Sequence, residues 1–310
     1  MIQPALHYHH ADHARHATPG LRAVLAAQIR AIGLTLRRPA IVGAVLLALA
    51  MLLITVELRG TGKVVNFHPE QYVLPGLLGL LLPLAVWKGE DRFAAAFLWT
   101  LPVERRRHAL AKVLAGWVWL MAAVALAVLW ILALALFSGG TVLGEELRPT
   151  LPGYSREFTG PFDPSAVQQV WWTPQPLLWL VPFTAATVTY LLASAIAVGL
   201  RQPLRWIVGG VFGFFLLVAI AETADAVRVI EGADRLVDAL LNGRYGIHAL
   251  LTARTESLQV AATLTTGERL VVWRAFPDPG EWVVATLVWT GGSLGALWAA
   301  ASRHRERRRA

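Results

Sequence analysis

The chain has no cysteine and few charged residues. Among its 310 residues, Asp, Glu, Lys and Arg together make up only 15%, whereas soluble domains carry about 25% charged residues. Without Cys, a disulfide framework, a thiolate metal site and a cysteine nucleophile are excluded. The low charge and the 56% hydrophobic content indicate a polytopic membrane protein.

Ionisable side chains are also absent from the apolar runs. Six runs contain no Asp, Glu, Lys, Arg or His: 39–56, 72–87, 113–137, 177–200, 206–221 and 282–301. A spanning helix needs about 20 residues, so the second and fifth runs are short. Ion-coupled carriers and intramembrane hydrolases usually need ionisable groups at depth, which argues against both classes. We expect an all-α polytopic membrane protein with six transmembrane helices, in a domain over 39–301.

A phosphate-binding loop is missing as well. Gly62-Lys63 is similar to the end of such a loop, but Val64 stands where Ser or Thr is needed and Glu57 stands where the first Gly is needed. We therefore expect no nucleotide on this chain.

The chain also lacks a recognisable metal or catalytic site. Acidic residues and a histidine in the segments between the apolar runs have no known ligand spacing; they include Glu145, Glu146, Asp163 and His248. We treat them as solvated loop residues, and we expect no metal, no cofactor and no enzymatic activity on this chain.

Lys and Arg are distributed unevenly among the hydrophilic segments. The N-terminus before residue 39, together with 88–112, 201–205 and 302–310, holds 18 Lys and Arg against 5 Asp and Glu. The remaining segments hold 10 against 15. Because Lys and Arg are enriched in cytoplasmic loops, we predict that both termini are cytoplasmic. The net charge of +8 is then a topology signal rather than a sign of nucleic-acid binding, and anionic lipid headgroups are the nearer partner of the basic tail 302–310.

The N-terminal region has two parts. Residues 1–17 hold five of the nine histidines; we expect a disordered tail, with metal binding as the alternative. Residues 18–38 begin with a capping Thr18 and with Pro19 at the first helical position. Apolar residues then recur at helical spacing among arginines, which predicts an amphipathic helix in the membrane interface.

The outer segments, 138–176 and 222–281, are large enough for small elaborations. Residues 138–176 are rich in Gly and Pro, and we expect an ordered loop or lid without regular structure. Residues 224–243 predict an amphipathic helix. Residues 257–276 alternate in places around Thr-Thr-Gly at 265–267, which predicts a β-hairpin.

Small and weakly polar residues recur in three of the apolar runs. Two GxxxG pairs, Gly209 with Gly213 and Gly291 with Gly295, let helix backbones approach closely. A subunit interface and ordinary internal packing are equally consistent with them. The fourth run carries a weakly polar face that could line a substrate path or make interhelical hydrogen bonds; its members are Thr184, Thr187, Tyr190 and Ser194.

Thirteen tryptophans are many for this length. Most of them fall near the ends of the apolar runs, as expected for an aromatic belt at the bilayer interfaces. They include Trp87, Trp117, Trp119, Trp179, Trp206, Trp282 and Trp298.

Segment 88–112 is the most charged of those between two runs that we place inside the cell. Phe93, Phe97 and Leu101 follow at intervals of four and so share one helical face. Pro102 then interrupts the helix, because it lacks an N–H and clashes with the preceding turn. We expect two short helices joined by a kink, lying on the membrane surface and able to dock a partner.

The same segment resembles the type-2 class of ABC transporter permeases. The resemblance lies in an acidic residue after the second span, a Leu-Pro-Val sequence, a basic residue and a lysine at the start of the third span. Here these are Glu90, Leu101-Pro102-Val103, Arg105 and Lys112. The chain departs from the pattern at Glu104, where members of the class often have a small residue.

The resemblance implies a permease subunit of an ATP-driven exporter in a bacterial inner membrane. Two permease subunits, identical or different, would surround a path, each docked on a cytoplasmic ABC ATPase chain that binds the ATP and Mg. Segment 88–112 would transmit movement of the ATPase to the second and third spans, through Glu90, Arg92, Phe93, Phe97, Pro102, Arg105 and Lys112.

Two other functions stay open on the sequence. One is a six-span scaffold or receptor that moves nothing, and the other is a membrane enzyme with its site in the outer segments. A neighbouring reading frame that encodes an ATPase with a phosphate loop would favour the exporter.

Overall fold

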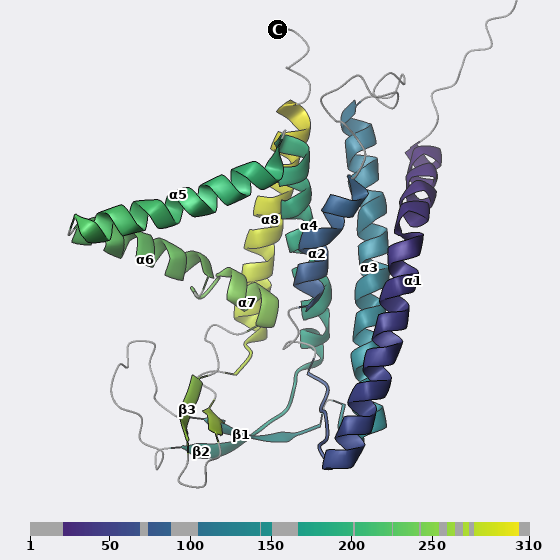
Figure 1. Ribbon diagram of the computed structural model, residues 1–310, viewed down its shortest axis with the longest axis vertical. Coiled ribbons are helices and arrows are strands. Elements are labelled where there is room, and N and C mark those ends of the chain that lie inside the picture. Colours follow the sequence, from purple (N-terminus) through teal and green to yellow (C-terminus); the bar gives the residue numbers. More distant parts are fainter. Residues whose placement is uncertain are drawn as a thin grey trace, which may run out of the picture.

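The structure is a computed structural model, and it describes residues 21–68, 74–87, 105–142, 144–150, 167–200, 202–224, 226–241, 243–253, 259–263, 269–272 and 276–303. Figure 1 shows a bundle of long helices with short strands at one end. Five helices in the described part are long and apolar enough to cross a membrane, so the chain is a membrane-embedded protein.

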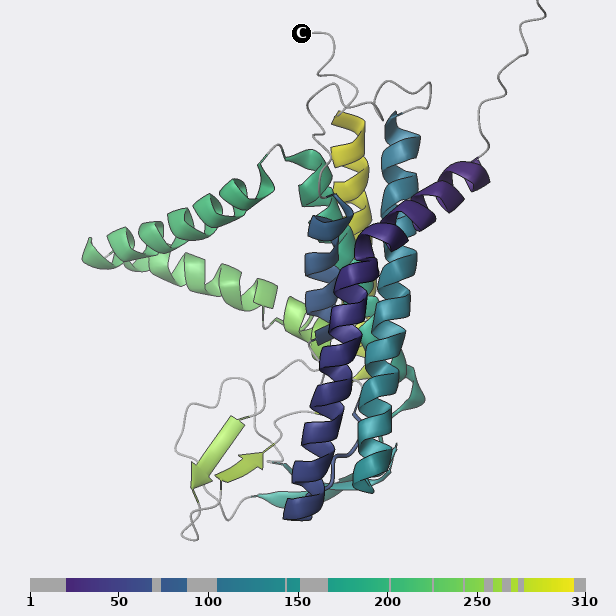
Figure 2. The same ribbon diagram turned by 45° about the vertical axis from the view of Figure 1, so that its right-hand side comes forward.

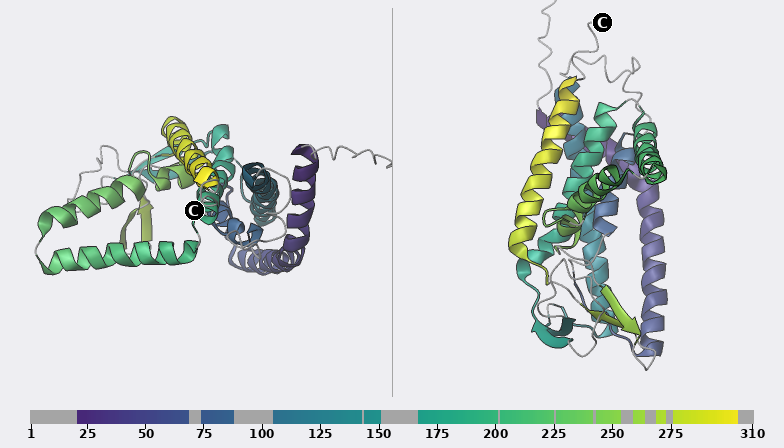
Figure 3. Two further views of the ribbon diagram at one scale, coloured as in Figure 1. Left: turned by 90° about the horizontal axis from the view of Figure 1, so that it is seen from above. Right: turned by 90° about the vertical axis from the view of Figure 1, so that its left-hand side faces the viewer.

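Four long helices run side by side: α1 (Leu21–Thr61), α3 (Arg105–Ser138), α4 (Val181–Gly199) and α8 (Pro279–Arg303). The short 3-10 helix η4 (Pro176–Leu180) leads into α4. Helix α4 is central, because it packs against α2, α3, α7 and α8. Figure 3 shows the bundle from above, with α1 at its edge.

Helix α1 joins two segments that the sequence separates. The predicted interfacial helix 18–38 and the first predicted span 39–56 form one continuous helix, Leu21–Thr61, in the described residues. Pro39 lies inside it, and Figure 2 shows the N-terminal part of α1 turning away from the rest. An internal Pro removes one backbone hydrogen bond and kinks a helix without having to end it.

Helix α2 (Leu74–Val86) is shorter than the predicted second span 72–87. Its 13 residues extend about 20 Å, which is less than the roughly 30 Å of a bilayer core. Six membrane-length helices are therefore not seen in the described residues, and the sixth crossing stays a prediction.

Helix α5 (Pro203–Thr223) corresponds to the fifth predicted span but projects sideways out of the bundle rather than running along it (Figures 1 and 2). It packs chiefly against α6 (Val227–Leu241), which returns toward the bundle. Its large apolar side chains are exposed on all sides, including Trp206, Phe212 and Phe215. Because so little of the described chain packs against α5, its direction is not fixed by a neighbouring span.

The strands form two antiparallel pairs, at what we call the strand end. Strand β1 (Glu146–Thr150) pairs with β2 (Gln168–Trp172), and β3 (Gln259–Thr263) pairs with β4 (Arg269–Val272). Our expectation of no regular structure in 138–176 is therefore wrong. The physical reason is that Val170-Trp171-Trp172 has high strand propensity, and the Trp172 ring stacks on Phe276 with centroids 6.1 Å apart. Strands β3 and β4 lie inside the region where the sequence predicts a hairpin.

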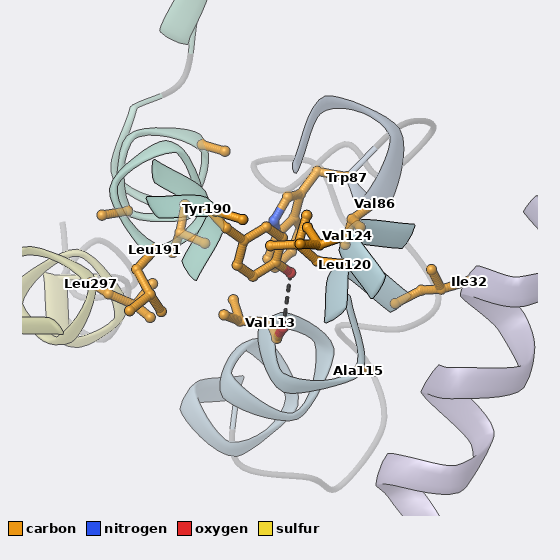
Figure 4. Close-up of a cluster of buried hydrophobic side chains, with 14 of the residues drawn as sticks. Ile32, Val86, Trp87, Val113, Ala115, Leu120, Val124, Tyr190, Leu191 and Leu297 are labelled. Atoms are coloured by element: carbon orange, nitrogen blue, oxygen red, sulfur yellow. Dashed lines mark hydrogen bonds between the residues drawn. The ribbon is translucent and has the colours of Figure 1, made fainter. Parts of the chain in front are cut away.

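The main core lies between α2, α3 and α4, with contributions from α1 and α8. Figure 4 shows Tyr190 of α4 among Val86, Trp87, Leu120 and Val124. A smaller cluster joins the first residues of α4 and α8 to α7 (Ile247–Thr252); it contains Leu178, Val181, Ala253 and Trp282. The two clusters hold the bundle together at different levels.

Candidate coupling face at the basic end of the bundle

The end of the bundle where α3 begins and α8 ends is here called the basic end. Arginines in the first turn of α3 and at the last residue of α8 lie at this end, namely Arg106, Arg107 and Arg303, and Arg205 lies in the first turn of α5. The predicted coupling residues Glu90, Arg92, Phe93, Phe97 and Pro102 lie outside the described residues. Arg105 is the first residue of α3. The structure therefore describes both flanks of the predicted docking segment.

Lys112 and Trp87 connect these two flanks. Trp87 follows α2 and is buried, and Lys112 lies in α3 with only 5% of its surface exposed. The Lys112 ammonium is 4.9 Å from the centroid of the Trp87 ring. A cation over a tryptophan face at this range contributes about 2 kcal/mol when it is shielded from water. The residues on either side of segment 88–104 are thus held together at the basic end.

The first turns of α3 are also attached to α8 and α1. The guanidinium carbon of Arg106 lies 3.2 Å from the centroid of the Trp298 ring, near the end of α8. Farther along α3, the indole N–H of Trp119 donates to the carbonyl oxygen of Ile29 in α1 over 2.9 Å. Gly33 allows this approach, because a Cβ there would lie 2.6 Å from the Trp119 ring.

Helix α2 is packed tightly against α4. A Cβ at Gly79 would collide with the carbonyl oxygen of Ala186 and the hydroxyl of Thr189. The Thr189 hydroxyl donates to the carbonyl oxygen of Gly76 over 2.9 Å. Glycine is needed here because two helix backbones come within touching distance. Movement of α2 would therefore be passed directly to α4.

Helix α4 is in turn bonded to α3 by its weakly polar face. The Tyr190 hydroxyl donates to the carbonyl oxygen of Val113 over 2.8 Å (Figure 4). The Trp117 indole donates to the Thr187 hydroxyl over 3.1 Å. The Thr184 hydroxyl donates locally, to the carbonyl oxygens of Leu180 at the end of η4 and of Val181 at the start of α4. For this face the sequence left two interpretations open, a substrate path or interhelical hydrogen bonds. Tyr190 and Thr187 make interhelical hydrogen bonds, and a role in lining a path stays a prediction.

Ser194 completes the set of four predicted for the fourth span. Its side chain is fully buried, one turn after Tyr190 in α4. The face that carries it points into the bundle rather than toward solvent in this conformation.

The two GxxxG pairs pack against nothing in the described residues. Apart from the backbone of the helix itself, no heavy atom of the described residues lies within 4 Å of a Cβ built at Gly209 or Gly213 in α5, or at Gly291 or Gly295 in α8. Internal packing, one of the two interpretations that the sequence left open, does not use these glycines in the described part of the chain.

Sequence reasoning missed several residues that fix the position of α2 and of the residue that follows it. Trp87 was placed in an aromatic belt, but it is buried. Trp282, at the other end of the bundle, was placed there too and is also buried, whereas Trp206 and Trp298 are exposed. The close approach at Gly76 and Gly79 was also missed. The spacing of these two glycines in a short apolar helix is a signal that could have indicated a packing face.

At the strand end, away from the basic end, a histidine and an arginine side chain are in contact. Arg148 of β1 and His68 approach each other, with Nη2 of Arg148 2.9 Å from Nε2 of His68. Arginine can only donate, so Nε2 of His68 is the acceptor in this contact. Among the described residues, no group of three or more His, Cys, Asp or Glu side chains could hold a metal ion.

No protein-family model matches the chain, and neither a curated protein nor a solved structure is significantly similar to it.

Proposed function

We propose that the chain is the membrane subunit of an ATP-driven exporter of the type-2 ABC class. It would lie in a bacterial inner membrane with both termini cytoplasmic, beside a second permease subunit. A separate ATPase chain would bind the ATP and Mg. The observation that carries the proposal is the contact between Lys112 and Trp87. These two buried residues lie on either side of the permease-like motif in the sequence, and the contact holds them together.

The packing around these anchors supports a transmission role. Segment 88–104 continues directly from α2 at one side and into α3 at the other. Helix α2 lies against α4 through Gly79, and α4 is bonded to α3 through Tyr190. A displacement of the docked segment would therefore reach all three helices, α2, α3 and α4, rather than one helix alone.

The proposal is tested by co-purification with the ATPase encoded beside the gene. Phe97→Ala combined with Glu90→Lys should abolish co-purification while the chain still inserts into the membrane. Truncating a buried aromatic anchor costs about 2 kcal/mol or more, which weakens binding roughly 30-fold. The six apolar runs contain neither residue, so insertion should be unaffected.

A matched control is available in α5, where Phe212 and Glu222 are both exposed. Phe212→Ala combined with Glu222→Lys makes the same chemical changes away from segment 88–112. We expect this variant to retain the ATPase. Retention of the ATPase by the Phe97 and Glu90 variant would instead place Phe97 in the lipid interface and remove the docking assignment.

A further inference from the structure

Helix α6 has one charged face and one apolar face. The charged face carries Arg228, Glu231, Asp234, Arg235 and Asp238, with a 2.8 Å ion pair between Arg235 and Glu231. The opposite face carries Val229, Ile230, Ala233, Leu236, Val237, Leu240 and Leu241. None of the residues of α6 is buried by the described chain. Val229, Leu236, Leu240 and Leu241 are exposed, whereas Ile230, Ala233 and Val237 are half-buried, and α5 is the main neighbour of α6. Part of the apolar face is thus without a protein cover in the described chain.

Both neighbours of α6 belong to the membrane-embedded part of the chain. Helix α5 precedes it directly and is apolar on all sides. After α6, Arg244 contacts the carboxylate of Glu281 over 2.5 Å, in the first turn of α8. The Trp289 indole of α8 also donates to the carbonyl oxygen of Tyr245 over 2.8 Å. These two contacts hold the residues that follow α6 beside the first turns of α8. The ion pair between Arg244 and Glu281 lies where the apolar part of α8 begins.

The dimensions and direction of α6 fit this level. Its 15 residues extend about 22 Å, too little to cross a bilayer core of roughly 30 Å. Figures 1 and 2 show it lying across the bundle axis, hence along the plane of a membrane that the bundle crosses. Amphipathic helices in this position bury the apolar face about 5–10 Å into the boundary between headgroups and acyl chains.

We propose that α6 lies in the bilayer interface near the start of α8, with the exposed part of its apolar face on phospholipid acyl chains. Lipid is the occupant because this face continues from the exposed apolar surface of α5. The charged face holds three acidic and two basic residues, so zwitterionic phospholipid is sufficient and anionic headgroups are not required. The proposal does not depend on the exporter function.

The absence of cysteine allows a direct test with single-cysteine variants of the full chain. Leu236→Cys reports on the apolar face and Asp234→Cys on the charged face, and both native side chains are exposed. Each variant is labelled with an environment-sensitive fluorophore and reconstituted into phosphatidylcholine vesicles. Half of the vesicles contain lipid with a nitroxide quencher near the headgroup.

At position 236 we expect blue-shifted emission, quenching by the nitroxide lipid and protection from aqueous iodide. At position 234 we expect the reverse. Equal iodide access at both positions would overturn the proposal. Protection of position 236 without quenching by the nitroxide lipid would also overturn it, because a protein surface such as a second copy would then cover the face. Leu240→Cys and Glu231→Cys form a second pair, which decides the question if a member of the first pair does not elute as a monodisperse species.

Discussion

Gly79 is the residue on which the contact between α2 and α4 depends most directly. We predict that Gly79→Ala lowers the free energy of unfolding by about 1–3 kcal/mol, the usual cost of forcing a methyl group into a packed site. The added Cβ would meet the carbonyl oxygen of Ala186, which belongs to helix backbone and cannot rotate away. Reversible unfolding in mixed detergent micelles measures the effect.

Gly209→Ala is the control for this prediction, because apart from its own helix backbone no described atom lies within 4 Å of a Cβ at that position. Both substitutions replace Gly by Ala inside an apolar helix, so both gain the same helix propensity, up to about 1 kcal/mol. The difference between the two variants therefore isolates the steric effect. Equal stability of the two proteins would show that α2 does not pack on α4 in this way.

At the level of elements, two tryptophans attach α1 to α3. Trp119 and Trp130 donate to the carbonyl oxygens of Ile29 and Leu47, each over 2.9 Å. We predict that Trp119→Phe and Trp130→Phe each cost about 1 kcal/mol of stability, the net value of a typical hydrogen bond. The two sites are about 16 Å apart along the helix, so the double variant should lose the sum of the two.

Trp206→Phe provides the comparison, since Trp206 is exposed on α5 and such surface changes are usually within about 0.5 kcal/mol. Unfolding of all four variants under one condition gives the free energies. A double variant as stable as the unsubstituted chain would mean that α1 is held by other contacts.

A second prediction at this scale concerns Lys112, and it rests on the proposed function. Lys112→Met keeps most of the side-chain volume but removes the charge that faces the Trp87 ring. We expect the ATPase to bind normally but no longer to move α2 relative to α3. Spin labels at the exposed positions Leu84 and Leu114, measured with and without trapped nucleotide, report the movement as a change in distance.

Lys63→Met removes the same charge from an exposed position in the loop after α1, and it should leave the nucleotide-dependent distance change intact. If Lys112→Met also leaves it intact, the Lys112 and Trp87 contact does not transmit movement. Loss of ATPase binding in Lys112→Met would instead show that this lysine holds the docking surface in place.

The elements were predictable from the sequence to different extents. Long apolar runs located both ends of α4 and α8 and the last residue of α3 to within a few residues, because lipid selects for continuous hydrophobic length. The start of α3 was missed, because the helix begins at Arg105, before the apolar run that starts at 113. The continuity of α1 through Pro39 was not predictable, since a proline also ends many helices. The burial of Lys112 against Trp87 was missed because it depends on how α2 and α3 meet, and no local pattern encodes a contact between two helices.

At the scale of the whole molecule, contacts between helix ends show which of these ends lie at the same end of the bundle. The loop after α1 bonds to the end of α3, where the backbone N–H of Val65 donates to the Ser138 hydroxyl. The start of α3 meets the end of α8 through Arg106 and Trp298. Two connections therefore run from one end of the bundle to the other: from α1 to α3 through the short α2, and from α4 to α8 through α5, α6 and α7.

If each of these two connections crosses the membrane, the chain crosses it six times, although only five of its described helices have membrane length. We predict that reporter fusions at residues 20 and 308 give cytoplasmic signals and that fusions at 160 and 260 give extracytoplasmic signals. Position 260 is the most informative, because it follows α5, which projects sideways out of the bundle in Figure 1. A cytoplasmic signal at 260 would mean that the chain does not cross between α4 and α6. The strand end would then have to be divided between two sides of the membrane, which the position of β1 against β4 does not allow.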